Sequence, residues 1–190
     1  MIPTYSFPCV YVYFTNVIIS LFSLYKNGLK IYENPVGVLT NNPPFDFHLH
    51  NLANYIGLSV DQPENTFSNE ISLAPYSLGM GAIGLPGDLS SASRFVRATF
   101  TKLNSFGNDV SRFFHILTNV AQPMGLNRLS ENKYEYTIYS SCCDTEKGIY
   151  YYTTYENRQI SAVDMNKANL NGNELAEFPL IKGQSVFRQN

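Results

Sequence analysis

The sequence predicts a layered α+β domain in which antiparallel strands lie inside and helices lie outside. Strand-like runs rich in aromatic residues fill the C-terminal third, and the middle run, GIYYYTTY at 148–155, is aromatic on both faces. Such a strand is typical of a sheet that is covered on both sides. Helical periodicity precedes these runs, so helices are available to cover the sheet.

The composition is that of one soluble globular domain. Of the 190 residues, 44% are hydrophobic and 15% are charged, which is enough apolar material for a core. The net charge of −2 gives no electrostatic basis for binding nucleic acid. Two of the three cysteines are adjacent, at Cys142 and Cys143. This pattern forms no disulfide framework and favours reduced thiols in a cytoplasmic protein.

The first 25 residues carry no charged side chain and are treated as a segment of their own. The run 10–25, VYVYFTNVIISLFSLY, is shorter than the ~20 apolar residues of a membrane-spanning helix and is broken by polar residues. The first basic residue is Lys26, whereas a secretory signal begins with positive charge. The β-branched and aromatic residues favour a buried strand, with a membrane-seeking segment as the alternative. We expect a divergent apolar leader at 1–25, no membrane partner, and the main domain at 26–190.

Strands and then helices are predicted after Lys26. Short strands at 29–32 and 36–40 are bounded by turn signals. An amphipathic helix is expected over 44–57, where Phe45, Leu49, Leu52 and Ile56 recur at helical spacing.

The second half of the chain is expected to contain two helices and three strands. Ser90 and Ser91 are good N-caps for a helix whose buried stripe is Phe95, Val96, Thr99, Phe100 and Leu103. A further helix is expected from Asp109 to about Asn119, followed by strands at 134–141, 148–155 and 159–165.

Glycine and histidine motifs give no cofactor or metal site. The segment 79–84 matches G-x-G-x-x-G, but Pro86 interrupts the chain directly afterwards, so we expect a flexible loop rather than a nucleotide site. His48 and His50 lack further ligands and are expected to face solvent on their helix. His115 is expected to pack against the third helix. The sequence therefore predicts no cofactor and no metal.

Asn41 and Arg94 each allow two interpretations. Asn41 lies where a strand ends, so it serves either turn formation or the binding of a developing oxyanion. Arg94 lies in the first turn of the second helix. It is either a surface arginine paired with Asp88 or a fixed cation in a pocket.

The sequence resembles the choloylglycine hydrolase family in four runs, at 28–52, 85–100, 112–121 and 146–167. The runs follow one another in the same order as in the family, and the resemblance covers roughly residues 26–175. The family contains conjugated bile salt hydrolases and penicillin V acylases, and the runs look closer to the bile salt branch. The resemblance implies an N-terminal nucleophile hydrolase αββα sandwich, here incomplete. It also implies hydrolysis of glycine- or taurine-conjugated bile salts by an N-terminal cysteine whose own α-amino group is the base.

The resemblance assigns two supporting catalytic residues. Asn41 matches the asparagine of the VLTN motif near the oxyanion, and Arg94 matches the arginine of the SRF motif beside the nucleophile. No cysteine matches the nucleophile, because Cys9 is internal and Cys142 and Cys143 lie in the strand region. An out-of-frame leader joined to a genuine C-terminal half is one hypothesis for such a chain.

Three functions follow from this resemblance. The first is a truncated bile salt hydrolase that is inactive alone. The second is a non-catalytic bile-salt-binding module. The third is a half that becomes active together with a separate N-terminal half. A penicillin V acylase-type amidase fragment remains an alternative within the family. Apolar faces left uncovered favour self-association.

Overall fold

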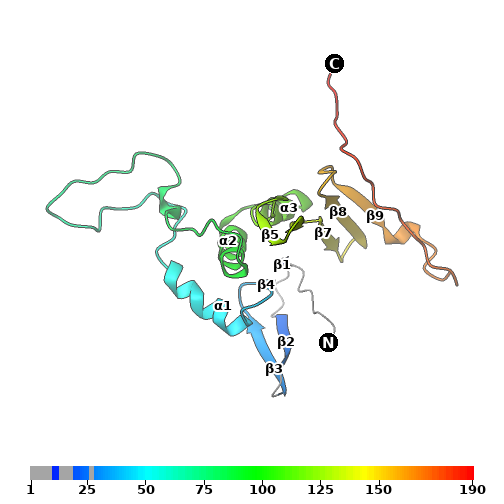
Figure 1. Ribbon diagram of the computed structural model, residues 1–190, viewed down its shortest axis with the longest axis horizontal. Helices are drawn as coiled ribbons and strands as arrows, with labels where there is room; N and C mark the ends of the chain where they lie inside the picture. Colours follow the sequence, from blue (N-terminus) through cyan, green and yellow to red (C-terminus); the bar gives the residue numbers. More distant parts are fainter. Residues whose placement is uncertain (1–9, 13–18, 26–27) are drawn as a thin grey trace. The chain divides into compact units, whose positions relative to one another are not determined.

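The computed structural model describes residues 10–12, 19–25 and 28–190 (Figure 1). The chain divides into two compact units, Met1–Ser105 and Phe106–Asn190. Helices and antiparallel strands occur in both units, which confirms the mixed α+β composition.

Four strands form two antiparallel pairs in the first unit. β1 (Val10–Val12) pairs with β4 (Val38–Thr40), and β2 (Ile19–Tyr25) pairs with β3 (Gly28–Asn34). The strand expected in 10–25 is therefore confirmed within 10–12 and 19–25, while residues 1–9 and 13–18 of the predicted leader lie outside the described residues.

The turn between β3 and β4 is built by the buried side chain of Asn34. Its Nδ2 donates to the carbonyl of Val38 at 3.0 Å, and its Oδ1 accepts from the N–H of Gly37 at 2.9 Å. Gly37 has a φ of 62°, a conformation that glycine adopts without a steric penalty. This turn determines the direction in which β4 enters the corner at Asn41.

The helices of the first unit include α1 (Phe45–Asn51), the 3₁₀ turn η1 (Leu52–Tyr55) and α2 (Ser91–Asn104). The predicted helix over 44–57 is thus an α-helix only to Asn51, and Ile56 is 87% exposed. The predicted cap is confirmed, because Ser90 caps α2 by accepting from the N–H of Ser93. Side chains of α1, α2 and β4 form the core of this unit, with Val38, Phe45, Phe95, Val96 and Ala98 buried.

The predicted buried stripe of α2 is confirmed at its start and fails at its end. Phe95 and Val96 are fully buried, whereas Leu103 is 58% exposed. The exposed residue lies in the last turn of α2, beyond the part of the helix that packs on α1 and β4.

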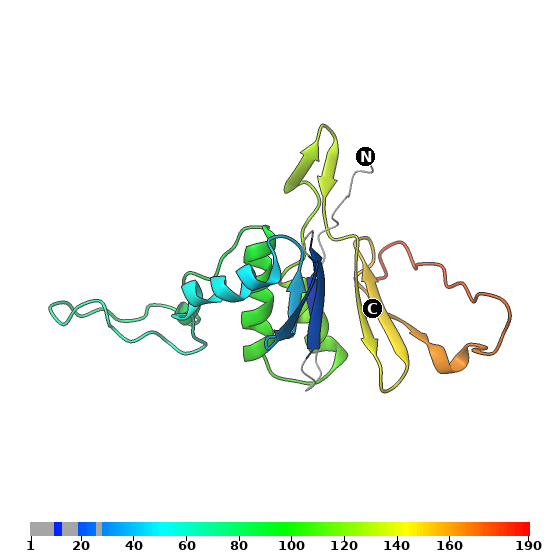
Figure 2. The same cartoon turned by 90° about the horizontal axis from the view of Figure 1, so that it is seen from below.

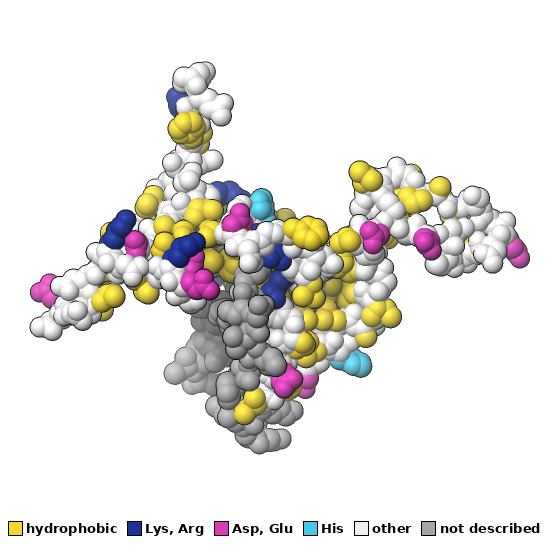
Figure 3. Space-filling model, turned by 180° about the vertical axis from the view of Figure 1, so that it is seen from behind, with side chains coloured by type: hydrophobic (Ala, Val, Ile, Leu, Met, Phe, Trp, Pro, Cys, Tyr) yellow, Lys and Arg dark blue, Asp and Glu magenta, His cyan; other side chains and the backbone are white. Residues whose placement is uncertain are grey.

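A long loop joins η1 to the 3₁₀ turn η2 (Met80–Ala82) and extends beyond the end of α1 (Figure 2). This loop comprises residues 56–79. Its exposed apolar residues include Phe67, Tyr76 and Leu78. Figure 3 shows hydrophobic side chains at the surface of this extended loop. The two ends of the loop meet where the N–H of Ser59 donates to the carbonyl of Gly81, in η2, at 2.9 Å.

The second unit contains α3 (Val110–Thr118), a hairpin and a three-stranded antiparallel sheet. The helix expected from Asp109 to about Asn119 is confirmed as α3, and Asp109 caps it by accepting from the N–H of Arg112 at 2.8 Å. The hairpin is β5 (Asn127–Ser130) with β6 (Lys133–Glu135). The sheet has the order β7 (Tyr139–Asp144), β8 (Ile149–Thr154), β9 (Ser161–Asp164), and η3 (Met165–Lys167) follows.

The second unit corrects two expectations. The strand predicted over 134–141 is interrupted between Glu135 and Tyr139, because β6 pairs with β5 and β7 pairs with β8. The expected cover on both faces of β8 is incomplete within the described residues, where only Tyr152 of that strand is buried. The remaining β8 residues are half-buried.

Candidate functional site

The candidate site begins where β4 ends, at Asn41. Its side-chain Oδ1 accepts from Thr40 Oγ1 at 3.1 Å, from Ser91 Oγ at 3.1 Å and from Arg94 Nη2 at 3.5 Å. Three donors around one atom identify that atom as the oxygen of the carboxamide. The Nδ2 group is on the other branch of the same planar amide, so its direction is fixed by the contacts to Oδ1.

Arg94 is held beside this carboxamide by the first turn of α2. Its Nε donates to the carbonyl of Leu89 at 3.1 Å and its Nη2 donates to Ser91 Oγ at 3.1 Å. The side chain is only 4% exposed, so the interpretation of Arg94 as a surface arginine is wrong. Asn41 and Arg94, the two residues predicted from the sequence, are therefore brought together.

The chain before α2 is fixed by Asp88, Ser93 and Arg97. The Asp88 carboxylate accepts from the N–H of Ser90 at 2.8 Å and from the hydroxyl of Ser93. Hydrogen bonds from Ser90 and Ser93 lower the pKa of Asp88 to about 2. Arg97 Nη1 donates to the carbonyls of Pro86 at 2.9 Å and Asp88 at 2.7 Å. It is thus Arg97 that contacts Asp88, and these contacts position the Leu89 carbonyl that Arg94 binds.

His48 was expected to face solvent, and this prediction is wrong. The side chain is 0% exposed, because it stacks on the ring of Phe95 with centroids 4.8 Å apart and an interplanar angle of 22°. Its Nε2 lies 3.0 Å from the backbone carbonyl oxygen of Asn41. Burial lowers the pKa of His48, although its contacts with the backbone at Asn41 and Pro43 act in the opposite direction, and the charge of Arg94 adds a smaller lowering effect.

Sequence reasoning missed His48 and Ser91 as members of this cluster. His48 lies seven residues after Asn41 and Ser91 lies fifty residues after it. The only signal for Ser91 was its position three residues before Arg94, a spacing that places the two side chains on one helix face. His48 gave no such signal, since its partner is a backbone carbonyl.

The other predicted residues lie outside the cluster. His50 is exposed as expected, but His115 is exposed on α3 rather than packed against it. Burial and the neighbouring Cys143 and Asp144 raise the pKa of the Cys142 thiol. A raised thiol pKa is the opposite of what an activated nucleophile requires.

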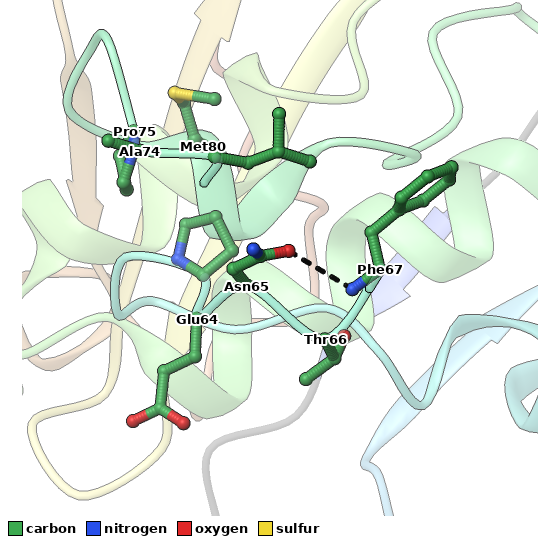
Figure 4. Close-up of a pocket in the computed structure, with 9 residues that line it drawn as sticks. Glu64, Asn65, Thr66, Phe67, Ala74, Pro75 and Met80 are labelled. Atoms are coloured by element: carbon green, nitrogen blue, oxygen red, sulfur yellow. Dashed lines mark hydrogen bonds between the residues drawn. The ribbon is translucent and has the colours of Figure 1, made fainter. Parts of the chain in front are cut away.

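A separate cavity of about 280 Å³ lies in the loop. It does not include the Asn41 cluster, which consists of Asn41, His48, Ser91 and Arg94. Figure 4 shows Met80 and Pro75 across from Glu64 and Thr66, and the N–H of Phe67 donating to Asn65 Oδ1 at 3.2 Å. Within the described ranges, no group of three His, Cys, Asp or Glu side chains is placed to hold a metal. None of the described helices is long and apolar enough to cross a membrane.

A permanent cation that donates to the oxygen of a fixed carboxamide has a defined chemical use. Hydrogen-bond donation to Oδ1 draws electron density from the amide and strengthens its Nδ2–H groups as donors. Such prearranged donors suit the negative charge that develops on a carbonyl oxygen during acyl transfer.

Residues 16–178 match the model of the linear amide C–N hydrolases, choloylglycine hydrolase family. The chain belongs to this family. It is 59% identical over 170 residues to a bile salt hydrolase/transferase of Lactiplantibacillus plantarum, covering 87% of the chain and 52% of the relative. It is 45% identical over 170 residues to a bile salt hydrolase/transferase of Clostridium perfringens, with the same coverage of each chain.

Two solved structures share this fold to different degrees. The conjugated bile acid hydrolase from Clostridium perfringens matches with a TM-score of 0.83 and 43% identity, over 90% of this chain and 54% of that one. A penicillin V acylase from Agrobacterium tumefaciens matches with a TM-score of 0.55 and 21% identity, over 78% of this chain and 42% of that one, which shows likeness of fold alone. The chain spans about half the length of the curated relatives it matches.

Proposed function

We propose that this chain is the C-terminal part of a conjugated bile salt hydrolase, in which Asn41 and Arg94 stabilise the negative charge that forms on the substrate amide. The observation that carries the proposal is the contact of Arg94 Nη2 with Asn41 Oδ1 at 3.5 Å between residues 53 positions apart. The 59% identity to a bile salt hydrolase/transferase of Lactiplantibacillus plantarum supports the substrate class.

The chemistry assigned to this chain is electrostatic. Attack of a thiolate on an amide carbonyl moves an electron pair onto the carbonyl oxygen and creates an oxyanion. Asn41 donates from its carboxamide to that oxygen, and Arg94 strengthens the donor by its own donation to Oδ1. Ser91 links the two side chains, since its Oγ accepts from Arg94 and donates to Asn41 Oδ1.

The attacking thiolate is assigned to a half that is not this chain. Cys142 is half-buried with a raised pKa, and its neighbour Cys143 is exposed on the same strand of the second unit. Asn41 and Arg94 belong to the first unit, and Cys9 lies outside the described residues. We therefore expect the chain alone to bind conjugated bile salts without hydrolysing them.

The experiment measures the release of glycine from glycocholate and of taurine from taurocholate. The purified chain is assayed alone and after co-expression with the preceding half of the Lactiplantibacillus plantarum relative. We expect no release by the chain alone and release by the pair. Turnover by the chain alone that persists through purification, or an inert pair in which the two halves co-purify, would contradict the proposal.

Penicillin V serves as the competing substrate in the same assay. The acylase likeness is one of fold at 21% identity, so we expect the pair to cleave glycocholate in preference to penicillin V. If the pair cleaved penicillin V in preference to glycocholate, we would assign the chain to the acylase branch of the family instead.

A further inference from the structure

His48 occupies a position that packing alone does not require. A carbonyl oxygen only accepts hydrogen bonds, so the 3.0 Å contact with Asn41 places a hydrogen on Nε2 of the imidazole. Nδ1 is buried and has no hydrogen-bond partner among the described residues. Burial of an unpartnered nitrogen is destabilising. An apolar ring would fill the same space without that penalty. We therefore look for the function of the imidazole in its contact with the Asn41 carbonyl.

Asn41 is held at two separate points. His48 binds its backbone carbonyl, while Thr40, Ser91 and Arg94 bind its side-chain oxygen. The peptide that follows Asn41 is planar and trans, so binding its carbonyl fixes the orientation of the whole group. The Cα of Asn41, and with it the base of the carboxamide, is therefore restrained from the backbone side as well.

We propose that His48 is a positioning residue, which holds the backbone carbonyl of Asn41 and thereby aims the Asn41 carboxamide at the substrate oxyanion. This inference rests on the proposed function for its consequence in catalysis, but the positioning itself is a property of the chain alone. His48 acts through Asn41 and is assigned no contact with the substrate.

The surroundings of His48 keep it suitable for this task. Burial lowers the pKa of His48, and the positive charge of Arg94 acts in the same direction. The ring is consequently neutral near pH 7, with its single hydrogen available for the carbonyl. A protonated ring would add a second positive charge beside Arg94 and change the field at the site.

Two substitutions separate hydrogen bonding from packing. His48→Phe keeps an aromatic ring to stack on Phe95 but removes the donor. His48→Gln removes the ring but keeps an amide donor that reaches the position of Nε2. The matched controls are His50→Phe and His50→Gln, at an exposed histidine on the same helix.

The direct test is nuclear magnetic resonance on the full 190-residue chain. We expect the His48 imidazole to carry its hydrogen on Nε2. We expect the side-chain amide signals of Asn41 to move in His48→Phe, to return toward their original positions in His48→Gln, and to stay unchanged in both His50 variants. An Nδ1–H tautomer, or Asn41 signals that survive His48→Phe and shift only in His48→Gln, would overturn the inference.

Turnover by the pair of halves gives the functional consequence. We expect His48→Phe to lower kcat for glycocholate by about tenfold with KM little changed, because a misaligned donor loses stabilisation mainly in the transition state. His48→Gln restores most of that loss. A rise in KM alone, or equal kcat in both variants, would contradict positioning. If the unsubstituted pair is inert, the proposed function fails while the resonance experiment still decides the role of His48.

Discussion

The corner formed by Asn41, His48 and Arg94 and the loop 56–79 belong to one unit but are stabilised in different ways. In the corner, polar side chains are buried and bind partners far away in sequence, as Arg94 binds Asn41. In the loop, many hydrogen bonds join near neighbours in sequence, as when Asn65 Nδ2 donates to the carbonyl of Ile71 at 2.8 Å, and Phe67 is 80% exposed. Stability is thus concentrated where residues from distant parts of the chain meet.

The first prediction compares two phenylalanines. Phe95 is fully buried under His48 and Phe45, whereas Phe67 is 80% exposed in the loop. Phe95→Ala should lower the free energy of unfolding by about 3–5 kcal/mol, because it leaves a cavity in the core. Phe67→Ala should change it by less than about 0.5 kcal/mol. Urea titration followed by circular dichroism measures both, and equal losses would remove the distinction between corner and loop.

Arg94 gives the second largest expected effect. Arg94→Met keeps much of the side-chain volume but leaves the oxygens of Leu89, Ser91 and Asn41 without this donor. We expect a loss of about 2 kcal/mol in unfolding free energy, since buried acceptors lose a charged partner. The control is Arg158→Met at an exposed arginine. A variant at Arg94 as stable as that control would show that the buried cation does not stabilise the corner.

Gly81, in η2 at the end of the loop, packs against the backbone at the start of the loop as closely as residues pack in the corner. A Cβ at Gly81 would overlap the carbonyl oxygens of Asp61 and Ser59, whereas a Cβ at Gly57 would meet nothing within 4 Å. Gly81→Ala should cost about 1–2 kcal/mol through displacement of the backbone, and Gly57→Ala should be neutral or slightly stabilising. Limited proteolysis of the loop, followed by mass spectrometry, should show faster cleavage in Gly81→Ala alone.

Ser90 tests the local contribution to the corner. Ser90→Ala removes the N-cap of α2 and should lower the unfolding free energy by about 1 kcal/mol. Ser77→Ala in the loop removes only a contact with the neighbouring carbonyl and should have no measurable effect. The same urea titration measures the unfolding free energy of both variants. If Ser77→Ala lowered it as much as Ser90→Ala does, the assignment of Ser90 as the cap would be contradicted.

The smallest expected effect is a dependence on pH at Asp88. Its pKa is lowered to about 2 in the folded chain, so the unfolded chain binds a proton at a higher pH than the folded chain does. The stability from this carboxylate is present above its ordinary pKa of about 4 and is lost as the pH falls toward 2. Asp88→Asn should flatten the loss of stability between pH 5 and pH 2. An unchanged acid profile would show that the Ser90 and Ser93 contacts do not stabilise the anion.

Local chemistry made part of this molecule predictable. The cap at Ser90 follows from a side chain that bonds its own helix, and it is confirmed. The aromatic strands of the second unit also follow from composition, but the cover over β8 does not. Only Tyr152 of that strand is buried within the described residues. The sequence pattern indicates which side chains a strand can bury, but it does not indicate which segment covers them.

The candidate site was predictable only in its two matched residues. The resemblance named Asn41 and Arg94, yet their contact spans 53 positions and no local pattern encodes it. His48 was misjudged because a histidine in an amphipathic helix is usually solvated, and the carbonyl that binds it becomes visible only when the chain is folded.

The most direct test of the central claim is glycine release from glycocholate by the co-expressed pair of halves, with Asn41 intact or replaced by alanine. Removing a donor to the oxyanion should lower kcat by about 100-fold or more, with the fold retained by circular dichroism. Asn54→Ala, at an exposed asparagine of η1, serves as the matched control and should leave the rate unchanged. A pair with Asn41→Ala that releases glycine as fast as the original pair would contradict the assignment of this corner to catalysis.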